Sequence, residues 1–208
     1  MTKLFHTRTA LLIFLLIIVS GFGGSKFQSN CPPEGRSRDG SVLSEKWQET
    51  NREKNRRTQP AFNDIDQSIT LAKMLSSGDD PNKFNHNNGA TIEGYIYEAR
   101  DERKESCNCY SANHADYDVH VFISQNPHPS GIGQCAVIEI TPYSRQMNSQ
   151  WTSQYINQNF AGKKVKVTGW MLHDWEHTDV SYETNPLATH LERRTVWEIH
   201  PITNIQFE

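Results

Sequence analysis

The sequence predicts a mainly β domain, a five-stranded barrel with one helix between its third and fourth strands, preceded by a partly helical N-terminal extension. Five segments within residues 89–208 alternate apolar and polar side chains, which is the period of a half-buried strand. Between the third and fourth of these segments, apolar residues recur at the spacing of one helix face. With 208 residues and 36% hydrophobic content, the chain can fill one ordinary core but not two.

The first predicted strand covers residues 90–99, with Ile92 and Ile96 turned toward one side and Glu93 and Tyr95 toward the other. The same alternation predicts four further strands, at residues 117–124, 135–141, 163–171 and 195–207. We expect the last of these strands to be broken at Pro201.

Residues 148–160 carry the helical pattern, because Trp151, Tyr155 and Phe160 recur at steps of four and five residues. Gly162 then ends the helix, where helix ends favour glycine. Three strands, a helix and two strands in this order match the five-stranded Greek-key barrel called the OB-fold. A small antiparallel sandwich with an inserted helix is the competing architecture.

The N-terminus has the pattern of a secretory signal peptide over residues 1–24. Lys3 and Arg8 precede the apolar run 10–19, and small residues lead to an expected cleavage near Gly23. The run has about half of the ~20 residues that a spanning helix needs, so an uncleaved leader is the alternative and would be the chain's contact with a membrane. We expect an exported protein: secreted, periplasmic or on the cell surface.

Residues 25–88 are expected to form a polar linker and a short helical extension before the barrel of residues 89–208. Apolar residues such as Trp47 stand at helical spacing just before the basic run that contains Lys54, which predicts one short amphipathic helix. Glutamates alternate with these basic residues, so we expect Lys54 on a solvated helix face. A small apolar cluster at residues 65–75 is expected to dock on the barrel.

The four cysteines are expected to form disulfides, because export brings the chain into oxidising surroundings. Cys107 and Cys109 flank a single residue, so a bond between them would close a strained ring. Each is expected to pair with Cys31 or Cys135 instead, and which partner goes with which is left open.

The charge of the chain argues against nucleic acid as a partner. There are 21 Lys+Arg against 24 Asp+Glu, and removal of Lys3 and Arg8 with the leader lowers the formal charge from −3 to −5. Residues 89–208 alone carry nine basic and fifteen acidic residues. Proteins that bind single strands combine exposed aromatic residues with a basic groove, so a polar small molecule, a glycan or a peptide is the expected partner.

The two longest loops of the barrel are expected to border its ligand face. They are residues 100–116, between strands one and two, and residues 172–194, between strands four and five. Outward-facing polar side chains of the second and third strands should lie between these loops. The predicted ligand-binding residues are Asp118, His120, Glu139, Arg145, Trp175, His177 and His200.

Two other interpretations of the same face remain open. Imidazoles and carboxylates together suit a divalent metal such as zinc, manganese or iron. The metal ligands would then be His120, Asp118, Glu139 and His177. This supports a metal-dependent hydrolase as the alternative function, with Asp118 or Glu139 as base, His120 as acid and Arg145 as anion clamp. The third interpretation is a hydrogen-bonded polar seam that fixes the loops without binding anything.

Five stretches of the barrel carry a resemblance: ESCNC at 105–109, DYDVH at 116–120, VIEITP at 137–142, GWMLHD at 169–174 and WEIHP at 197–201. Through them the chain resembles a group of uncharacterised exported bacterial proteins and, more loosely, OB-fold domains that bind oligonucleotides or oligosaccharides. The resemblance implies an OB-like fold and export, and it implies no particular activity because this barrel hosts many functions. The function predicted from the sequence is therefore an exported binding or accessory module.

Overall fold

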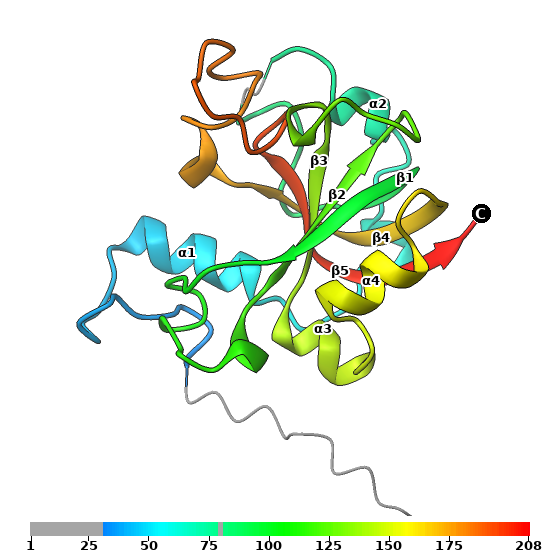
Figure 1. Ribbon diagram of the computed structural model, residues 1–208. Coiled ribbons are helices and arrows are strands. Elements are labelled where there is room, and N and C mark those ends of the chain that lie inside the picture. The colour runs from blue at the N-terminus through cyan, green and yellow to red at the C-terminus, as the bar shows by residue number, and fades with distance from the viewer. Residues whose placement is uncertain (1–30, 79–80) are drawn as a thin grey trace, which may run out of the picture.

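The computed structural model of this chain describes residues 31–78 and 81–208, so the predicted signal peptide lies outside the described residues. Five strands close into a barrel in the order β1-β2-β3-β5-β4, and β4 pairs back with β1 (Figure 1). This is the strand order of an OB-like barrel. The predicted fold class is confirmed, and the competing sandwich is wrong because the sheet has no open edges between two layers.

The strands are β1 Gly89–Asp101, β2 Val119–Ser124, β3 Ala136–Ile140, β4 Lys164–His173 and β5 Trp197–Phe207. Neighbouring strands are antiparallel except for β3 and β5, which run parallel. The predicted break at Pro201 is wrong, because β5 continues through that residue. Proline has no N–H to donate to a neighbouring strand. The strand is not interrupted, but its pairing with β4 is irregular, with a register shift between Gly169 and Met171 of β4.

Two helices, α3 Pro142–Met147 and α4 Ser153–Asn159, connect β3 to β4 where the sequence predicted one. Each begins at a threonine whose side-chain oxygen accepts a hydrogen bond from the first turn: Thr141 from Ser144, and Thr152 from Tyr155. The second cap explains why the predicted helix over residues 148–160 starts late. Short 3-10 helices lie at Phe62–Asp64, His114–Asp116, Ile132–Gln134 and Trp175–His177.

The barrel interior is filled by the apolar side of every strand, as the alternation predicted. Ile92, Val121 and Ile138 are fully buried in one core cluster with Trp197. Residues from the N-terminal extension belong to the same cluster: Ile69, together with Leu71 and Met74 of helix α2 Leu71–Met74. The extension is therefore part of the barrel's core, as its apolar cluster predicted.

Helix α1 Glu45–Lys54 docks on the barrel through polar side chains. Its buried residues are Thr50, Asn51 and Lys54, and the Asn51 Oδ1 accepts a hydrogen bond from the Ser106 hydroxyl at 3.1 Å. The expectation that Lys54 lies on a solvated face is wrong, since only 2% of this residue is exposed. The prediction failed because a basic residue among glutamates is normally solvated, whereas here the tertiary fold places three carboxylates around Lys54, one of them buried and two partly buried.

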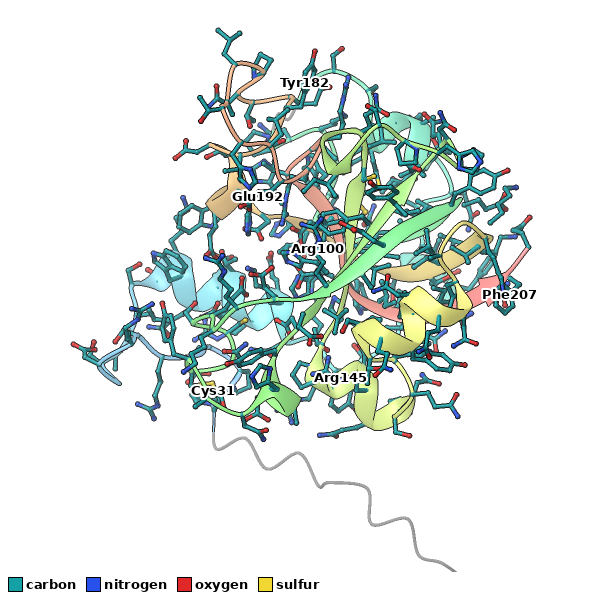
Figure 2. The ribbon with its side chains drawn as sticks, viewed as in Figure 1. Cys31, Arg100, Arg145, Tyr182, Glu192 and Phe207 are labelled. Atoms are coloured by element: carbon teal, nitrogen blue, oxygen red, sulfur yellow. A yellow bond between two sulfur atoms is a disulfide. The ribbon has the colours of Figure 1, made fainter. Side chains whose placement is uncertain are left out.

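A disulfide joins Cys31 to Cys109 and ties the start of the described extension to the β1–β2 loop. One of the open pairings is thereby decided, while Cys107 and Cys135 are buried free thiols and the expected second disulfide is absent. Figure 2 shows Cys31 at the edge of the molecule, beside that loop. Within the described residues, no helix combines the length and the apolar character needed to cross a bilayer.

We predict that Met74→Ala lowers the free energy of unfolding by about 2–5 kcal/mol, because it leaves a cavity in the barrel core. The matched control is Phe62→Ala, whose side chain is 81% exposed and should change stability by less than about 0.5 kcal/mol. Urea unfolding of both variants measures the difference. Equal midpoints would show that the extension is not part of the cooperative core.

Candidate functional site

The outer face of β2, β3 and β5 holds a row of buried polar side chains. His120 projects from β2, Glu139 from β3, and Glu198 and His200 from β5. His120 and Glu139 are directly paired across the two strands, and alternation turns the apolar neighbours of all four residues into the barrel. In OB-folds this outer face is the ligand face.

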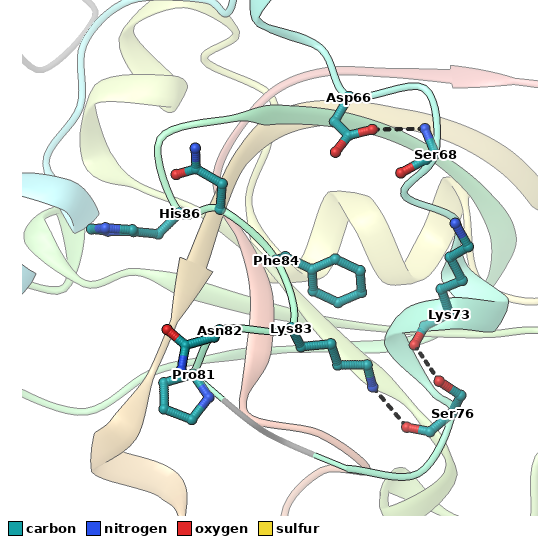
Figure 3. A pocket seen from close by; sticks show the side chains of 10 residues that line it. Asp66, Ser68, Lys73, Ser76, Pro81, Asn82, Lys83, Phe84 and His86 are labelled. Carbon is teal, nitrogen blue, oxygen red and sulfur yellow. Dashed lines mark hydrogen bonds between the residues drawn. The ribbon is translucent and has the colours of Figure 1, made fainter.

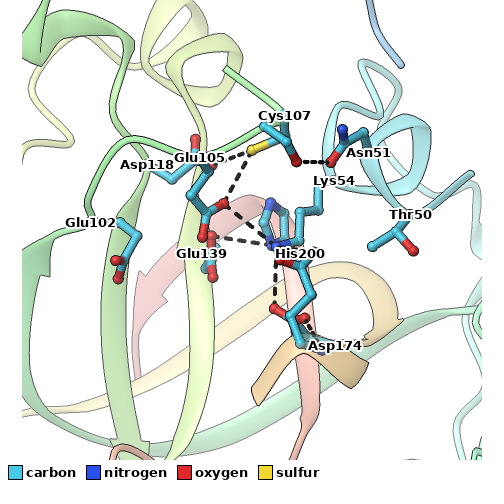
Figure 4. Close-up of polar contacts among 12 residues, drawn as sticks. Thr50, Asn51, Lys54, Glu102, Glu105, Cys107, Asp118, Glu139, Asp174 and His200 are labelled. Atoms are coloured by element: carbon cyan, nitrogen blue, oxygen red, sulfur yellow. Dashed lines mark hydrogen bonds and ion pairs between the residues drawn. The ribbon is translucent and has the colours of Figure 1, made fainter. Parts of the chain in front are cut away.

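Helix α1 and two loops cover this face. The Lys54 Nζ lies 3.5 Å from Glu105 Oε2 of the β1–β2 loop. The same atom lies 3.3 Å from Asp174 Oδ2 and 3.6 Å from Glu176 Oε1, both in the β4–β5 loop (Figure 4). The two long loops therefore meet over the barrel, as the sequence predicted, but they meet around a lysine of α1.

We call the whole set of contacting side chains the buried polar network. It consists of Lys54, Glu102, Glu105, Cys107, Asp118, His120, Glu139, Asp174, Glu176, His177, Arg193, Glu198 and His200. Seven of these residues are carboxylic acids, and two, Lys54 and Arg193, are strong bases. The network is thus rich in negative charge, and its ionisation states depend on which carboxylates have a cation beside them.

His120 lies between two glutamates. Its Nδ1 is 2.7 Å from Glu102 Oε2 and its Nε2 is 2.6 Å from Glu139 Oε1. Burial alone would lower the pKa of His120, but the two glutamates outweigh it and raise that pKa to about 10. Both ring nitrogens of the resulting imidazolium carry protons. His120, predicted as a metal ligand, is therefore a cation that holds Glu139 in its ionised form.

His200 has the opposite character. It is fully buried, and its Nδ1 lies 3.2 Å from Glu139 Oε2 and 3.3 Å from Glu198 Oε2. Burial lowers the pKa of His200 to about 4, against the opposing effect of Glu139. The ring is neutral, with its proton on the nitrogen that faces the glutamates. Its Nε2 then keeps a lone pair, and that atom is buried without a hydrogen-bond partner.

Asp118 is a buried carboxyl group that pairs with no cation within 4.0 Å among the described residues. Its nearest polar contact is the Cys107 thiol, with 3.5 Å between Sγ and Oδ2. Burial raises the pKa of Asp118 well above its usual range, and the charges of Glu139 and Glu105 raise it further. A positive charge beside Asp118 would restore the carboxylate.

The far side of the network is held together by ion pairs. Arg193 forms an ion pair with Glu198, and both side chains are buried. The His177 Nδ1 lies 3.0 Å from Asp174 Oδ2. Burial tends to raise the pKa of Asp174, but Lys54 and His177 lower it well below its usual range. These contacts hold the β4–β5 loop against α1 and β5.

Two residues predicted to bind a ligand, Arg145 and Trp175, make contacts within the protein instead. Arg145 of α3 donates hydrogen bonds to the carbonyl oxygens of Ala115 and Tyr117, and Figure 2 shows it at the opposite end of the molecule from Tyr182 in the β4–β5 loop. Trp175 packs edge-on against Trp47, with ring centroids 4.8 Å apart, and its Nε1 donates to the Thr50 hydroxyl. Arg145 thus fixes a loop, and Trp175 fixes α1.

Sequence reasoning missed Lys54 and Arg193, the two strong bases of the network. Lys54 follows Thr50 by four residues, so both lie on one helix face, but nothing in the sequence marks that face as buried. Arg193 precedes another arginine in a polar loop. One signal was present: the predicted outer face held several carboxylates, which require cations from elsewhere in the chain if they are buried.

Three side chains of the network lie close enough together to hold a metal ion. One ligand atom each from Asp118, Glu139 and His200 lies within 4.8 Å of the other two, and all three residues are at most 2% exposed. The structure thus brings together two of the predicted metal ligands, Asp118 and Glu139, and adds His200. His177 belongs to a separate group with Asp174 and Glu198.

No known family model and no curated protein sequence matches this chain.

We predict that Lys54→Met destabilises the protein by about 3–5 kcal/mol, because it leaves Asp174 and its neighbouring carboxylates buried without their cation. Lys104→Met is the matched control, since Lys104 is exposed and should tolerate the change. Thermal and urea unfolding measure both. If the two variants were equally stable, the ion pairs of Lys54 would contribute nothing.

Proposed function

We propose that this protein is an exported accessory module that binds one divalent cation on the outer face of its barrel, between Asp118, Glu139 and His200. The observation that carries the proposal is the convergence of two carboxylates and a neutral imidazole, within 4.8 Å of one another, in a fully buried position. A second observation is that the Nε2 of His200 is buried without a hydrogen-bond partner, so its lone pair is free to accept a ligand.

The charge of the network favours a cation over any other ligand. Burying an ionised carboxylate without a partner is costly, and Lys54, Arg193 and the His120 cation already have carboxylates of their own. A divalent ion beside Asp118, which has no cation within 4.0 Å among the described residues, would allow that carboxyl group to ionise. An anionic or neutral ligand in the same place would leave Asp118 without a positive partner.

The donor set indicates which cations fit. Two carboxylates and one imidazole suit zinc or manganese, whereas magnesium and calcium prefer ligand sets made of oxygen alone. The surrounding residues supply the outer contacts that metal sites use: Glu198 faces the His200 Nδ1, and His120 holds Glu139. These contacts would fix the orientation of both ligands before the ion arrives.

The enclosure of the site favours binding over hydrolysis. Catalytic metal sites keep a position open for water and substrate, but Asp118, Glu139 and His200 are at most 2% exposed beneath α1. A glycan or peptide at the two long loops would likewise have to displace α1, whose Lys54 occupies the space between them. A bound cation requires no such movement of α1.

The proposed export rests on the leader pattern of the sequence, and the Cys31–Cys109 disulfide is compatible with an oxidising location. In such a compartment a module that captures zinc or manganese would not depend on reduced thiols for affinity, since its ligands are carboxylates and an imidazole.

We predict that the protein, purified without histidine tag or chelator, carries about one zinc or manganese ion per chain by mass spectrometry. Asp118→Asn should weaken the binding of that ion at least about tenfold in calorimetric titration of chelator-treated protein, because an amide replaces a charged ligand. This variant is nearly isosteric, and it breaks no ion pair because Asp118 has none within 4.0 Å among the described residues.

The control is Asp179→Asn, which removes an exposed carboxylate of the β4–β5 loop and should bind the ion as the parent protein does. The proposal fails if the parent protein binds neither zinc nor manganese, or if Asp118→Asn binds the ion with unchanged affinity.

A further inference from the structure

A separate pocket lies where the chain after α1 crosses α3 and β5. Its volume is about 330 Å³, at the lower end of the range of small-molecule sites. Arg57 and Gln59 line it from the segment after α1, Tyr143 and Met147 from α3, and Pro201 from β5. None of the metal-binding candidates lines it, so it is independent of the cation site.

Two groups that line the pocket, the guanidinium of Arg57 and the indole N–H of Trp151, are donors that no described residue uses. The side chains of Arg56, Ser144 and Thr203 also line it, and these donate to backbone carbonyl oxygens. The Arg57 guanidinium forms no ion pair with any described carboxylate, and its one recorded contact is with the Tyr143 ring, 5.6 Å from the centroid. Trp151 is only 8% exposed, and its indole N–H donates to no described residue. No aspartate or glutamate lines the pocket, although the whole chain is acidic.

The remaining wall of the pocket is apolar. It is built from the rings of Tyr143 and Trp151, the side chain of Met147, and Pro201 and Ile202 of β5. Met147 is 73% exposed, although methionine usually fills gaps in a core. An exposed methionine beside two aromatic rings offers a surface on which a flat or branched apolar group can pack.

The larger pocket shown in Figure 3, about 680 Å³ in volume, is lined by two lysines, Lys73 and Lys83. The Lys83 ammonium there donates to the carbonyl oxygens of Ser76 and Gly78, at 2.8 Å each. Asp66 also lines that pocket and would repel an anion. The two pockets thus differ in charge, since a carboxylate lines the larger one and none lines the pocket beside Arg57.

We infer that the pocket beside Arg57 and Trp151 binds a small organic carboxylate with an aromatic or branched apolar body. The carboxylate pairs with the Arg57 guanidinium, which can present two parallel N–H groups, and accepts a hydrogen bond from the Trp151 indole. The apolar body packs on Tyr143, Met147 and Pro201. Inorganic anions lack the apolar body, and uncharged amides lack the charge, so both should bind far more weakly.

The test is calorimetric titration of the whole protein with benzoate, hippurate and indole-3-acetate, with benzamide and inorganic phosphate as comparison probes. At least one of the three carboxylates should bind at millimolar concentration or below. Arg57→Gln should weaken that binding about tenfold or more, because it removes the charged partner of the carboxylate. Met147→Glu should abolish the binding by placing a negative charge at the apolar wall.

Both variants change exposed side chains, so the fold should persist, and circular dichroism checks this. The matched control is Arg52→Gln, an exposed arginine of α1 that bonds Gln48 and does not line the pocket. The inference is overturned if none of the three carboxylates binds, if benzamide binds as tightly as benzoate, or if Arg57→Gln leaves the affinity unchanged. The titration does not depend on metal content, so a negative result here would not count against the proposed cation site.

Discussion

The arrangement of this molecule depends on how buried carboxylates are neutralised on one face of the barrel. Seven carboxylic acids meet in the buried polar network, and Lys54 and Arg193 are the strong bases paired with them. Removing a carboxylate from water typically costs about several kcal/mol per ion, unless a cation and hydrogen bonds replace the lost hydration. The Lys54 ammonium forms ion pairs with three of these carboxylates at once. Its position therefore couples α1 to both long loops, and the Cys31–Cys109 disulfide holds the other end of the extension nearby.

Because α1 is held over the barrel, it limits which ligands can reach the outer face. The face on which OB-folds bind their ligands is here covered by the chain's own helix, so a large ligand has no access to it. What remains beneath α1 is a compact group of carboxylate and imidazole donors, which suits an ion. The pocket beside Arg57 has the opposite character, an available guanidinium on an apolar wall. We thus propose two sites of opposite character in one acidic chain, a buried one for a cation and an open one for an organic anion.

The barrel itself was predictable because each strand is buried on one side and partly polar on the other. Ile92 and Ile96 of β1 and Val121 of β2 face the core as their alternation indicated. The boundary of α4 was less predictable, since the Thr152 cap competes with the apolar stripe that begins at Trp151. The docking of α1 was not predictable, because its buried face is polar and resembles a solvated one until the partner carboxylates are known.

The candidate site was predictable in position and not in chemistry. Alternation placed His120 and Glu139 on the outer face, and strand order brought the two long loops over them. Which histidine would be charged depends on the distances to particular carboxylates, and these follow from three-dimensional packing. His120 lies between two glutamates and takes a proton, whereas His200 is buried with its Nε2 unpartnered and stays neutral. The cation site that we propose therefore keeps Asp118 and Glu139 of the predicted metal set and has His200 in place of His120 and His177.

X-ray diffraction from crystals of the protein, recorded on both sides of the zinc and manganese absorption edges, tests the central claim most directly. The account predicts one anomalous peak in contact with Asp118, Glu139 and His200, beneath an unmoved α1. An anomalous peak elsewhere, or ordered water alone among these three side chains in crystals grown with either metal, would contradict it.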